Sequence, residues 1–471
     1  MLLMSSSHTW SRREFLGASA LTVVTAPLFS RAQTGLVPGF THRALNGWIT
    51  DLATEPDPNA AWPSMRLDEP LLKDYRETFA LMRRVGFNEI VIWGLYTANN
   101  WPLDLKSAVP PERGRKVEQL IANAHEHGIK VLSGLGTYSW GFAEIIKANP
   151  KLHGGNANAM CASEPESHAW MERVLDFVFS RFPIDGVSMQ SADQGRCQCA
   201  RCAKLGDAEY HAQLLARTAD TIHARWPDKI AGMSNWGVSF GNPKDQATFS
   251  KLSRSLDYMI DYNDSARWGG PGCRREFIAG LGCALGTTGG PVVEPPQHWA
   301  RNRWFLPTCR AVHQHLQALC ADGGRACECF YHILANPSSE LTWHVAGRTL
   351  VDPQAPLEKH LHAALEELYQ PRDADSREAL AQFFLEAEEA YLRHLPKDEC
   401  GTLSLEPLVG NRPGPPVYLR DRLKPEQRAA YAAAMERLSS VFSKLQPALQ
   451  SKPRTDRVRA CLAAVRKDLQ T

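Results

Sequence analysis

The sequence predicts an α/β protein in which a (β/α)8 TIM barrel is followed by an all-helical C-terminal region. Eight short apolar runs alternate with segments of helical spacing up to about residue 336, and longer amphipathic segments follow. The chain has 471 residues, more than the roughly 250–300 at which one hydrophobic core stops growing. We therefore expect a barrel over residues 40–338 and a helical region over residues 339–471.

The N-terminus carries the pattern of an export signal over residues 1–32. The segment Ser11-Arg12-Arg13-Glu14-Phe15-Leu16-Gly17 precedes a mild apolar run and then Ser30-Arg31-Ala32-Gln33. A twin arginine, a short apolar stretch and small residues at a cleavage site are typical of the twin-arginine pathway. The alternative is a frayed N-terminal helix. The signal predicts a periplasmic or extracellular protein that meets the membrane only through export.

Eight strands are expected in the barrel, and a helical pattern follows several of them. The parallel arrangement follows from this alternation, and the count favours a barrel over an open doubly wound sheet. No Gly-x-Gly-x-x-Gly follows the first strand and no Walker A sequence occurs, which argues against a nucleotide fold. The expected strands are Leu45–Asp51, Glu89–Leu95, Lys130–Leu135, Gly186–Ser191, Ile230–Ser234, Tyr258–Tyr262, Cys283–Thr287 and Cys327–Ile333, and the clearest helices between them are Arg115–His127, His168–Phe182 and Ala208–Trp226.

Amphipathic helices are expected to fill the rest of the chain. They are Leu341–Leu350, Leu357–Tyr369, Ser376–Leu395 and Pro425–Leu445, with Val409–Pro416 as a loop rich in Pro and Gly.

The composition excludes several classes of function. Hydrophobic residues make up 44% and charged residues 22%, which is ordinary for a globular protein. Lys and Arg number 53 against 51 Asp and Glu, a net charge of +2. So small a net charge gives no sign of a positively charged surface for binding nucleic acid. We expect no nucleic-acid partner, and the sequence predicts no oligomeric state.

Aromatic and polar residues gather where the expected strands end, which is the active-site face of a TIM barrel. Aromatic rings stack on the C–H face of a sugar, while carboxylates and amides bind its hydroxyls. The structural alternative is that the Trp residues belong to the core and the polar groups cap helices. The candidate substrate-binding residues are Trp93, Tyr96, Trp140, Trp236, Trp299, Arg301 and His332.

Two carboxyl groups are needed to hydrolyse a glycosidic bond. Asp193 comes just after the fourth expected strand, and Glu294 lies in the Pro-rich segment after the seventh. This placement resembles that of the large clan of barrel glycosidases, although the clan's Asn-Glu at strand four is absent. Asp261 and Asp264 are rivals for either role. The alternatives are a helix-capping role for Asp193 and an ion pair for Glu294.

Four cysteines form a second group of candidate functional residues. Cys197, Cys199 and Cys202 lie within six residues of sequence, and Cys161 is expected to approach them from a neighbouring loop. Four thiolates suit a closed, structural zinc site. Disulfides, which an exported protein allows, and plain buried thiols are the alternatives.

Four segments together resemble a family of exported bacterial proteins of unknown function related to alpha-glucuronidase-type barrels. They are Cys161-Ala162-Ser163-Glu164-Pro165, the motif from Asp193 to Cys202, Val345-Ala346-Gly347-Arg348-Thr349-Leu350 through Asp352-Pro353, and Leu365-Glu366-Glu367-Leu368-Tyr369. The resemblance covers roughly Leu45 to Leu395. It implies a glycoside-hydrolase-like barrel with Asp193 near the substrate cleft. Where the family has an Asn before that Asp and a run of Gly after it, this chain has Ala192 and Gln194.

The favoured hypothesis is an exported glycoside hydrolase that acts on a polysaccharide fragment, with a uronic-acid-bearing fragment as one candidate. Asp193 would be the proton donor or a substrate clamp, and Glu294 the base or nucleophile. No cofactor would be required for catalysis. The alternatives are a non-catalytic carbohydrate-binding barrel and, behind it, a zinc-dependent enzyme built on the four cysteines.

Overall fold

The computed structural model describes separate segments of the chain. The chain divides into two units, Met1–Val37 and Pro38–Thr471, and every described residue lies in the second. The expected export signal and the loop Val409–Pro416 fall outside them. None of the described helices combines the length and apolar character needed to cross a membrane. The described residues are 39–48, 67–97, 100–191, 194–235, 240, 242–261, 281–285, 305, 307–321, 323–330, 337–392 and 424–470.

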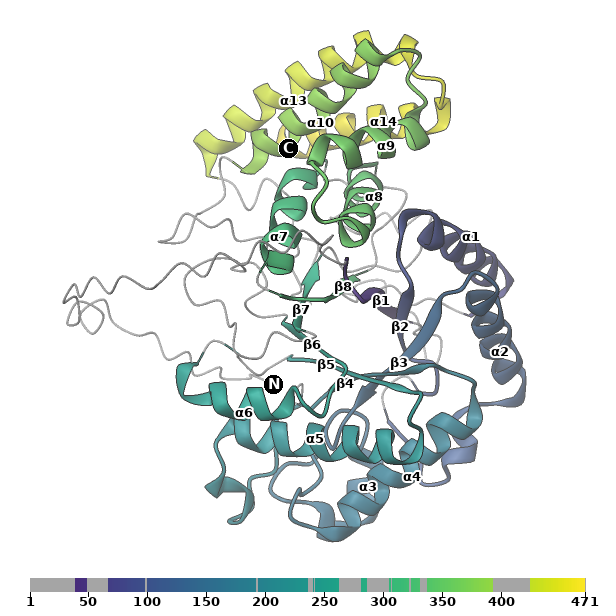
Figure 1. Ribbon diagram of the computed structural model, residues 1–471, viewed down its shortest axis with the longest axis vertical. Coiled ribbons are helices and arrows are strands. Elements are labelled where there is room, and N and C mark those ends of the chain that lie inside the picture. The colour runs from purple at the N-terminus through teal and green to yellow at the C-terminus, as the bar shows by residue number, and fades with distance from the viewer. Residues whose placement is uncertain are drawn as a thin grey trace, which may run out of the picture. The chain divides into compact units, whose positions relative to one another are not determined.

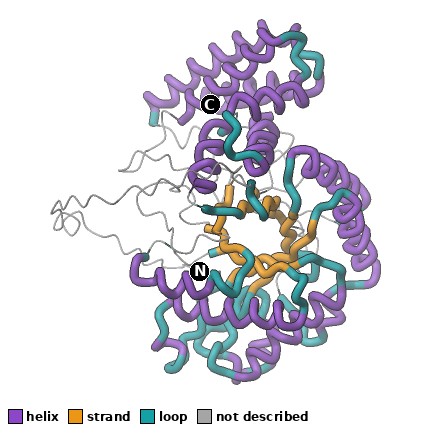
Figure 2. The backbone as a smooth tube through the Cα atoms, viewed as in Figure 1, coloured by secondary structure: helices purple, strands orange, loops and turns teal. Residues whose placement is uncertain are grey.

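Eight parallel strands close into a barrel, as the sequence predicts. Each strand pairs with the next, and β1 pairs with β8, where Ala44 lies opposite Glu328. Figure 2 shows the ring of strands with helices around it. The strands are β1 (His42–Trp48), β2 (Glu89–Trp93), β3 (Lys130–Gly136), β4 (Gly186–Gln190), β5 (Ile230–Ser234), β6 (Tyr258–Asp261), β7 (Leu281–Leu285) and β8 (Ala326–Phe330).

Helices follow most of the strands and pack on the outside of the barrel (Figure 1). Helix α1 was not among the helices expected from the sequence, although the side chain of Asp68 caps it by accepting a hydrogen bond from the Leu71 amide. The helices up to the last strand are α1 (Glu69–Val85), α2 (Pro111–Glu126), α3 (Ala143–Ala148), α4 (Pro165–Arg181), α5 (Asp207–Arg225), α6 (Gln246–Leu252) and α7 (Cys309–Ala321), with short 3-10 turns between some of them.

Some expected boundaries are wrong by two or three residues. Strand β1 begins at His42 rather than Leu45, because two polar residues at its start find partners in the fold. His42 Nδ1 lies 2.9 Å from the Glu89 carboxylate, and the Arg43 Nε donates to the Gly86 carbonyl. Strand β7 begins at Leu281 rather than Cys283, and β2 ends at Trp93 rather than Leu95.

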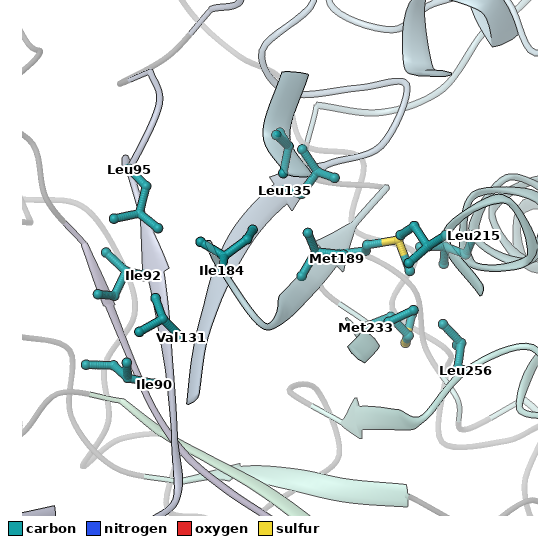
Figure 3. Close-up of a cluster of buried hydrophobic side chains, with 14 of the residues drawn as sticks. Ile90, Ile92, Leu95, Val131, Leu135, Ile184, Met189, Leu215, Met233 and Leu256 are labelled. Carbon is teal, nitrogen blue, oxygen red and sulfur yellow. The ribbon is translucent and has the colours of Figure 1, made fainter. Parts of the chain in front are cut away.

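The barrel strands bury both faces, each against a different layer. The outward residues, such as Ile90, Ile92 and Met189, join helix residues such as Leu215 in one hydrophobic cluster (Figure 3). The inward residues form a separate cluster inside the barrel that includes Val91 and Trp93. This alternation along strands buried on both sides explains why they appear in the sequence as continuous apolar runs.

The C-terminal helices share a second hydrophobic cluster. Helix α8 connects the two cores, because its Trp343 and Leu350 belong to the barrel cluster while Leu341 and Val345 belong to the helical one. Arg454 on α14 pairs with Glu340 at the start of α8. The helices are α8 (Pro337–Val351), α9 (Leu357–Tyr369), α10 (Ala374–Leu392), α13 (Pro425–Leu445) and α14 (Lys452–Gln470).

Because His344 on α8 is buried, we expect the protein to lose stability in acid. Its side chain is fully buried, and this burial lowers its pKa to about 3, against the opposing charge of Glu367. Below pH 6.5 the unfolded chain takes up a proton at this position and the folded chain does not, so the free energy of unfolding falls. The histidine should contribute a loss of about 2 kcal/mol between pH 6.5 and pH 5.

A His344→Gln variant should therefore lose less stability than the wild type over this pH interval, as measured by urea denaturation at several pH values. His362→Gln, at a partly exposed position on α9, is the matched control for the chemical change itself. Burial raises the pKa of Glu388 to about 7, so this group makes the free energy of unfolding rise as the pH falls. The contribution of His344 is therefore read from the difference between the pH dependences of the wild type and the variant. Parallel curves for the wild type and His344→Gln would contradict the prediction.

Candidate functional site

Two tryptophans meet where β2 and β3 end. Trp93 is the last residue of β2 and is 1% exposed inside the barrel. The ring of Trp140, from the loop after β3, lies 5.1 Å from the ring of Trp93 at a nearly perpendicular angle of 83°. Gly134 on β3 makes room, because a Cβ there would lie 2.0 Å from the Trp93 ring. Both tryptophans were predicted as sugar platforms, and that role stays a prediction.

The loop after β3 has a strained backbone. Tyr138 and Trp140 both have positive φ angles, of 61° and 56°, a conformation that costs non-glycine residues free energy. Hydrogen bonds to the end of β4 hold the loop in place. The Thr137 amide donates to the Gln190 carbonyl at 2.7 Å, and the Ser139 hydroxyl donates to the Ser191 carbonyl at 2.7 Å. The fold therefore couples this loop to the chain that leads into Asp193.

Tyr96 lies in the layer between the barrel and α4. Its hydroxyl donates to the Val178 carbonyl at 2.7 Å, and its ring packs against Trp101, Phe177 and Phe182. Burial raises the pKa of Tyr96 well above its ordinary value. These contacts give the side chain a packing role, and its part in substrate binding stays a prediction.

The remaining predicted residues lie at the edge of the described segments or beyond them. Asp261 ends β6, where its backbone is in register with Cys283 of β7. The other candidates lie outside the described residues; they are Asp193, Asp264, Glu294, Trp236, Trp299, Arg301 and His332.

A buried carboxylate inside the barrel was not predicted from the sequence. Glu328 on β8 is 1% exposed and accepts hydrogen bonds from residues of three other strands. The donors are Asn46 Nδ2 on β1 at 2.7 Å, the Ser188 hydroxyl on β4 at 2.8 Å and the Tyr258 hydroxyl on β6 at 3.0 Å. Burial, together with the charges of Glu328 and Glu89, raises the pKa of Tyr258, so its hydroxyl keeps the proton that it donates.

The sequence does contain a pattern that indicates the inward direction of the Glu328 side chain. Cys327 and Cys329 flank Glu328 on β8, and both are fully buried in the outer cluster. Because side chains alternate along a strand, the residue between two outward cysteines points into the barrel. The cysteine pair thus indicates an inward glutamate, although not the strands from which its donors come.

The four cysteines do converge. Sulfur atoms of Cys161, Cys197, Cys199 and Cys202 all lie within 4.8 Å of one another. The Sγ atoms of Cys161 and Cys199 are 3.6 Å apart, and none of the four forms a disulfide in the structure. Cys161 comes from the segment between β3 and α4, and the other three come from the segment between β4 and α5. Three of these side chains are buried, and Cys199 is partly exposed.

The thiols differ in their electrostatic environment. The backbone amide of Cys202 donates to Cys199 Sγ and, against burial, lowers the pKa of the Cys199 thiol to about 6. Burial raises the pKa of the Cys197 and Cys161 thiols instead. Of these three thiols, Cys199 thus ionises most readily.

Comparison with known proteins finds solved structures with a similar fold. No protein-family model and no curated protein matches the chain, so the resemblance drawn from its motifs stays a prediction. A GH138 enzyme targeting pectin rhamnogalacturonan II has a similar structure, with a TM-score of 0.57 and 10% identity. The match covers 92% of this chain and 57% of that enzyme, so this chain spans little more than half of its length.

Two further solved structures are similar to a lesser degree. One is an O-GlcNAc hydrolase mutant of Thermobaculum terrenum, with a TM-score of 0.48 and 12% identity over 91% of this chain and 82% of that one. The other is a beta-N-acetylhexosaminidase from Bacteroides fragilis, with a TM-score of 0.40 and 13% identity over 68% of each chain. At 10% identity, the likeness to the GH138 enzyme shows a shared barrel fold.

Proposed function

We propose that the protein is an exported glycoside hydrolase that cleaves a glycosidic bond in a plant or algal polysaccharide fragment by carboxylate chemistry. The observation that carries the proposal is the end of β4 at Gln190 in a closed barrel, with Asp193 three residues later in the sequence. Residues that follow barrel strands build the active sites of TIM-barrel enzymes. Asp193 is therefore our candidate for the acid.

We expect a second carboxyl group on the same side of the barrel. Glu294 follows β7 in the sequence, and Asp261 is the last residue of β6. Parallel strands of one barrel direct all of their C-terminal ends to one rim, so carboxyl groups that follow different strands can flank one substrate. We assign the base or nucleophile to Glu294, with Asp261 and Asp264 as the rivals.

The reaction needs these two groups in different protonation states. The acid, Asp193, would donate its proton to the oxygen of the leaving group as the glycosidic bond breaks. The ionised partner, Glu294, would attack the anomeric carbon or activate a water molecule. Both routes pass through a transition state with positive charge on the sugar ring, which a nearby carboxylate stabilises.

Sugar binding is supported by the aromatic pair at the ends of β2 and β3. Trp140 is partly exposed, and the buried Trp93 ring packs against it at nearly a right angle. The accessible face of Trp140 suits the C–H surface of a sugar. Arg301, with a planar guanidinium that can bind a carboxylate through two hydrogen bonds, is our candidate for recognising a uronic acid. The GH138 neighbour targets pectin rhamnogalacturonan II, which agrees with a plant polysaccharide as the source of the substrate.

Incubation with nitrophenyl glycosides and with oligosaccharides from pectin and other uronate-bearing polysaccharides tests the proposal. We expect turnover by the wild type and its loss in Asp193→Asn and in Glu294→Gln, with sugar binding kept in both because the aromatic contacts remain. Product release should be followed by chromatography and binding by calorimetry. Circular dichroism should show that both variants are folded.

Asp220→Asn is the matched control, since it makes the same chemical change at an exposed position of α5, and it should keep wild-type turnover. Binding without turnover in the wild type would instead support a non-catalytic carbohydrate-binding barrel. Turnover that survives in Asp193→Asn would remove Asp193 from the mechanism.

A further inference from the structure

We propose that Cys161, Cys197, Cys199 and Cys202 bind one Zn²⁺ ion, which ties the loop before α4 to the loop before α5. The inference is independent of the hydrolase activity, because it rests on the cysteine geometry alone. Its first support is the placement of the sulfur atoms, all within 4.8 Å of one another. A tetrahedral zinc with bonds of about 2.3 Å needs sulfur atoms about 3.8 Å apart, close to the 3.6 Å between Cys161 and Cys199.

The backbone around the sulfur atoms is arranged to stabilise negative charge. The Cys199 amide donates to Cys197 Sγ at 3.5 Å, and the Cys202 amide donates to Cys199 Sγ at 3.4 Å. Amide donors of this kind orient and stabilise metal-bound thiolates from outside the coordination shell. The Ser163 hydroxyl lies 3.1 Å from Cys202 Sγ and adds another polar contact to the cluster.

The neighbouring loop is shaped to let the cluster form. Gly154 lies against Cys197, where a Cβ would come within 2.0 Å of the sulfur atom. The Gln198 amide donates to the Gly154 carbonyl at 2.6 Å, and the Cys161 amide donates to the Leu152 carbonyl at 2.9 Å. An ion pair between Arg201 and Glu164 joins the two loops on the outside. Both loops therefore converge on a common point, as a shared ligand requires.

The arrangement suits zinc better than two disulfides. Disulfides would divide the four sulfur atoms into two pairs at about 2.05 Å, whereas these sulfur atoms lie around one centre. Four protein thiolates also complete a tetrahedral shell and leave no position open for water, so the ion would be structural rather than catalytic. Its effect on the site would be indirect, because Cys197 comes four residues after Asp193 in the sequence.

Metal analysis of the full-length protein, purified without added metal or chelator, tests the inference. We expect close to one zinc ion per chain in the wild type and almost none in Cys199→Ser. Cys320→Ser, which changes a buried thiol of α7 outside the cluster, is the matched control and should keep its zinc. Replacing the zinc by Co²⁺ should give the intense thiolate-to-cobalt charge-transfer absorption of a sulfur-rich tetrahedral site.

Chelation provides a second measurement that does not depend on the variant folding. A strong chelator should release the zinc from the wild type, lower its melting temperature and make four further thiols reactive. The same treatment should leave the melting temperature of any folded Cys199→Ser protein unchanged. A wild-type protein without metal, or peptide mapping that finds disulfides among these four residues, would overturn the inference. Iron in place of zinc would overturn the identity of the metal.

Discussion

Replacement of Glu328 by alanine is expected to lower the free energy of unfolding by about 4 kcal/mol. The Glu328 carboxylate accepts hydrogen bonds from Asn46, Ser188 and Tyr258 inside the barrel. Its removal leaves these donors without their shared acceptor in a place that water does not reach, and it also creates a cavity. Urea denaturation, followed by circular dichroism and by tryptophan fluorescence, measures the loss.

Two controls separate the network from a general effect of the substitution. Glu328→Gln keeps one acceptor oxygen and the side-chain volume, so it should cost less than the alanine variant. Glu126→Ala makes the same truncation at an exposed position near the end of α2 and should change stability by less than about 0.5 kcal/mol. A cost for Glu328→Ala no larger than that of Glu126→Ala would show that the network adds nothing to stability.

The barrel could be predicted from the sequence because its strands are buried on both faces. Runs such as Glu89–Trp93 are almost wholly apolar, and eight of them alternate with helical spacing. The expected cluster of Cys161 with the three later cysteines was also correct, because neighbouring parallel strands bring their following loops together.

The hydrophobic periodicity of the sequence was less informative where polar residues form part of a helix. Helix α1 was missed although Asp68 marks its start, and α7 was missed because polar histidine and glutamine residues interrupt its apolar spacing. Both histidines of α7, His313 and His315, are buried in the fold. The partner of His313 comes from elsewhere in the chain, since its Nδ1 lies 3.1 Å from the Thr349 hydroxyl of α8.

The network around Glu328 could not be predicted in full for a related reason. Strand periodicity indicates that a side chain points inward, but it does not say which inward side chains meet. Asn46 and Glu328 are far apart in the sequence, and they touch because the barrel closes between β1 and β8. Contacts across a barrel depend on its tilt and register, which no single strand encodes.

Replacement of Gly134 by alanine is expected to destabilise the barrel by about 3 kcal/mol. The added methyl group would lie 2.0 Å from the Trp93 ring, which is far inside van der Waals contact. The ring has little freedom to move, because it is buried inside the barrel and packs against Trp140. Gly206→Ala is the matched control, since nothing lies within 4 Å of its added methyl group.

A double-mutant cycle with Trp93→Phe tests whether the clash is the cause. Phenylalanine is smaller, so it leaves space for the methyl group of alanine at residue 134. The cost of Gly134→Ala, from urea denaturation, should therefore fall by at least about 1 kcal/mol in the Trp93→Phe background. An unchanged cost would mean that the alanine acts on the β3 backbone rather than on the ring. The same Trp93 ring supports Trp140, whose partly exposed face we propose for sugar binding, so Gly134→Ala should also weaken binding of an oligosaccharide.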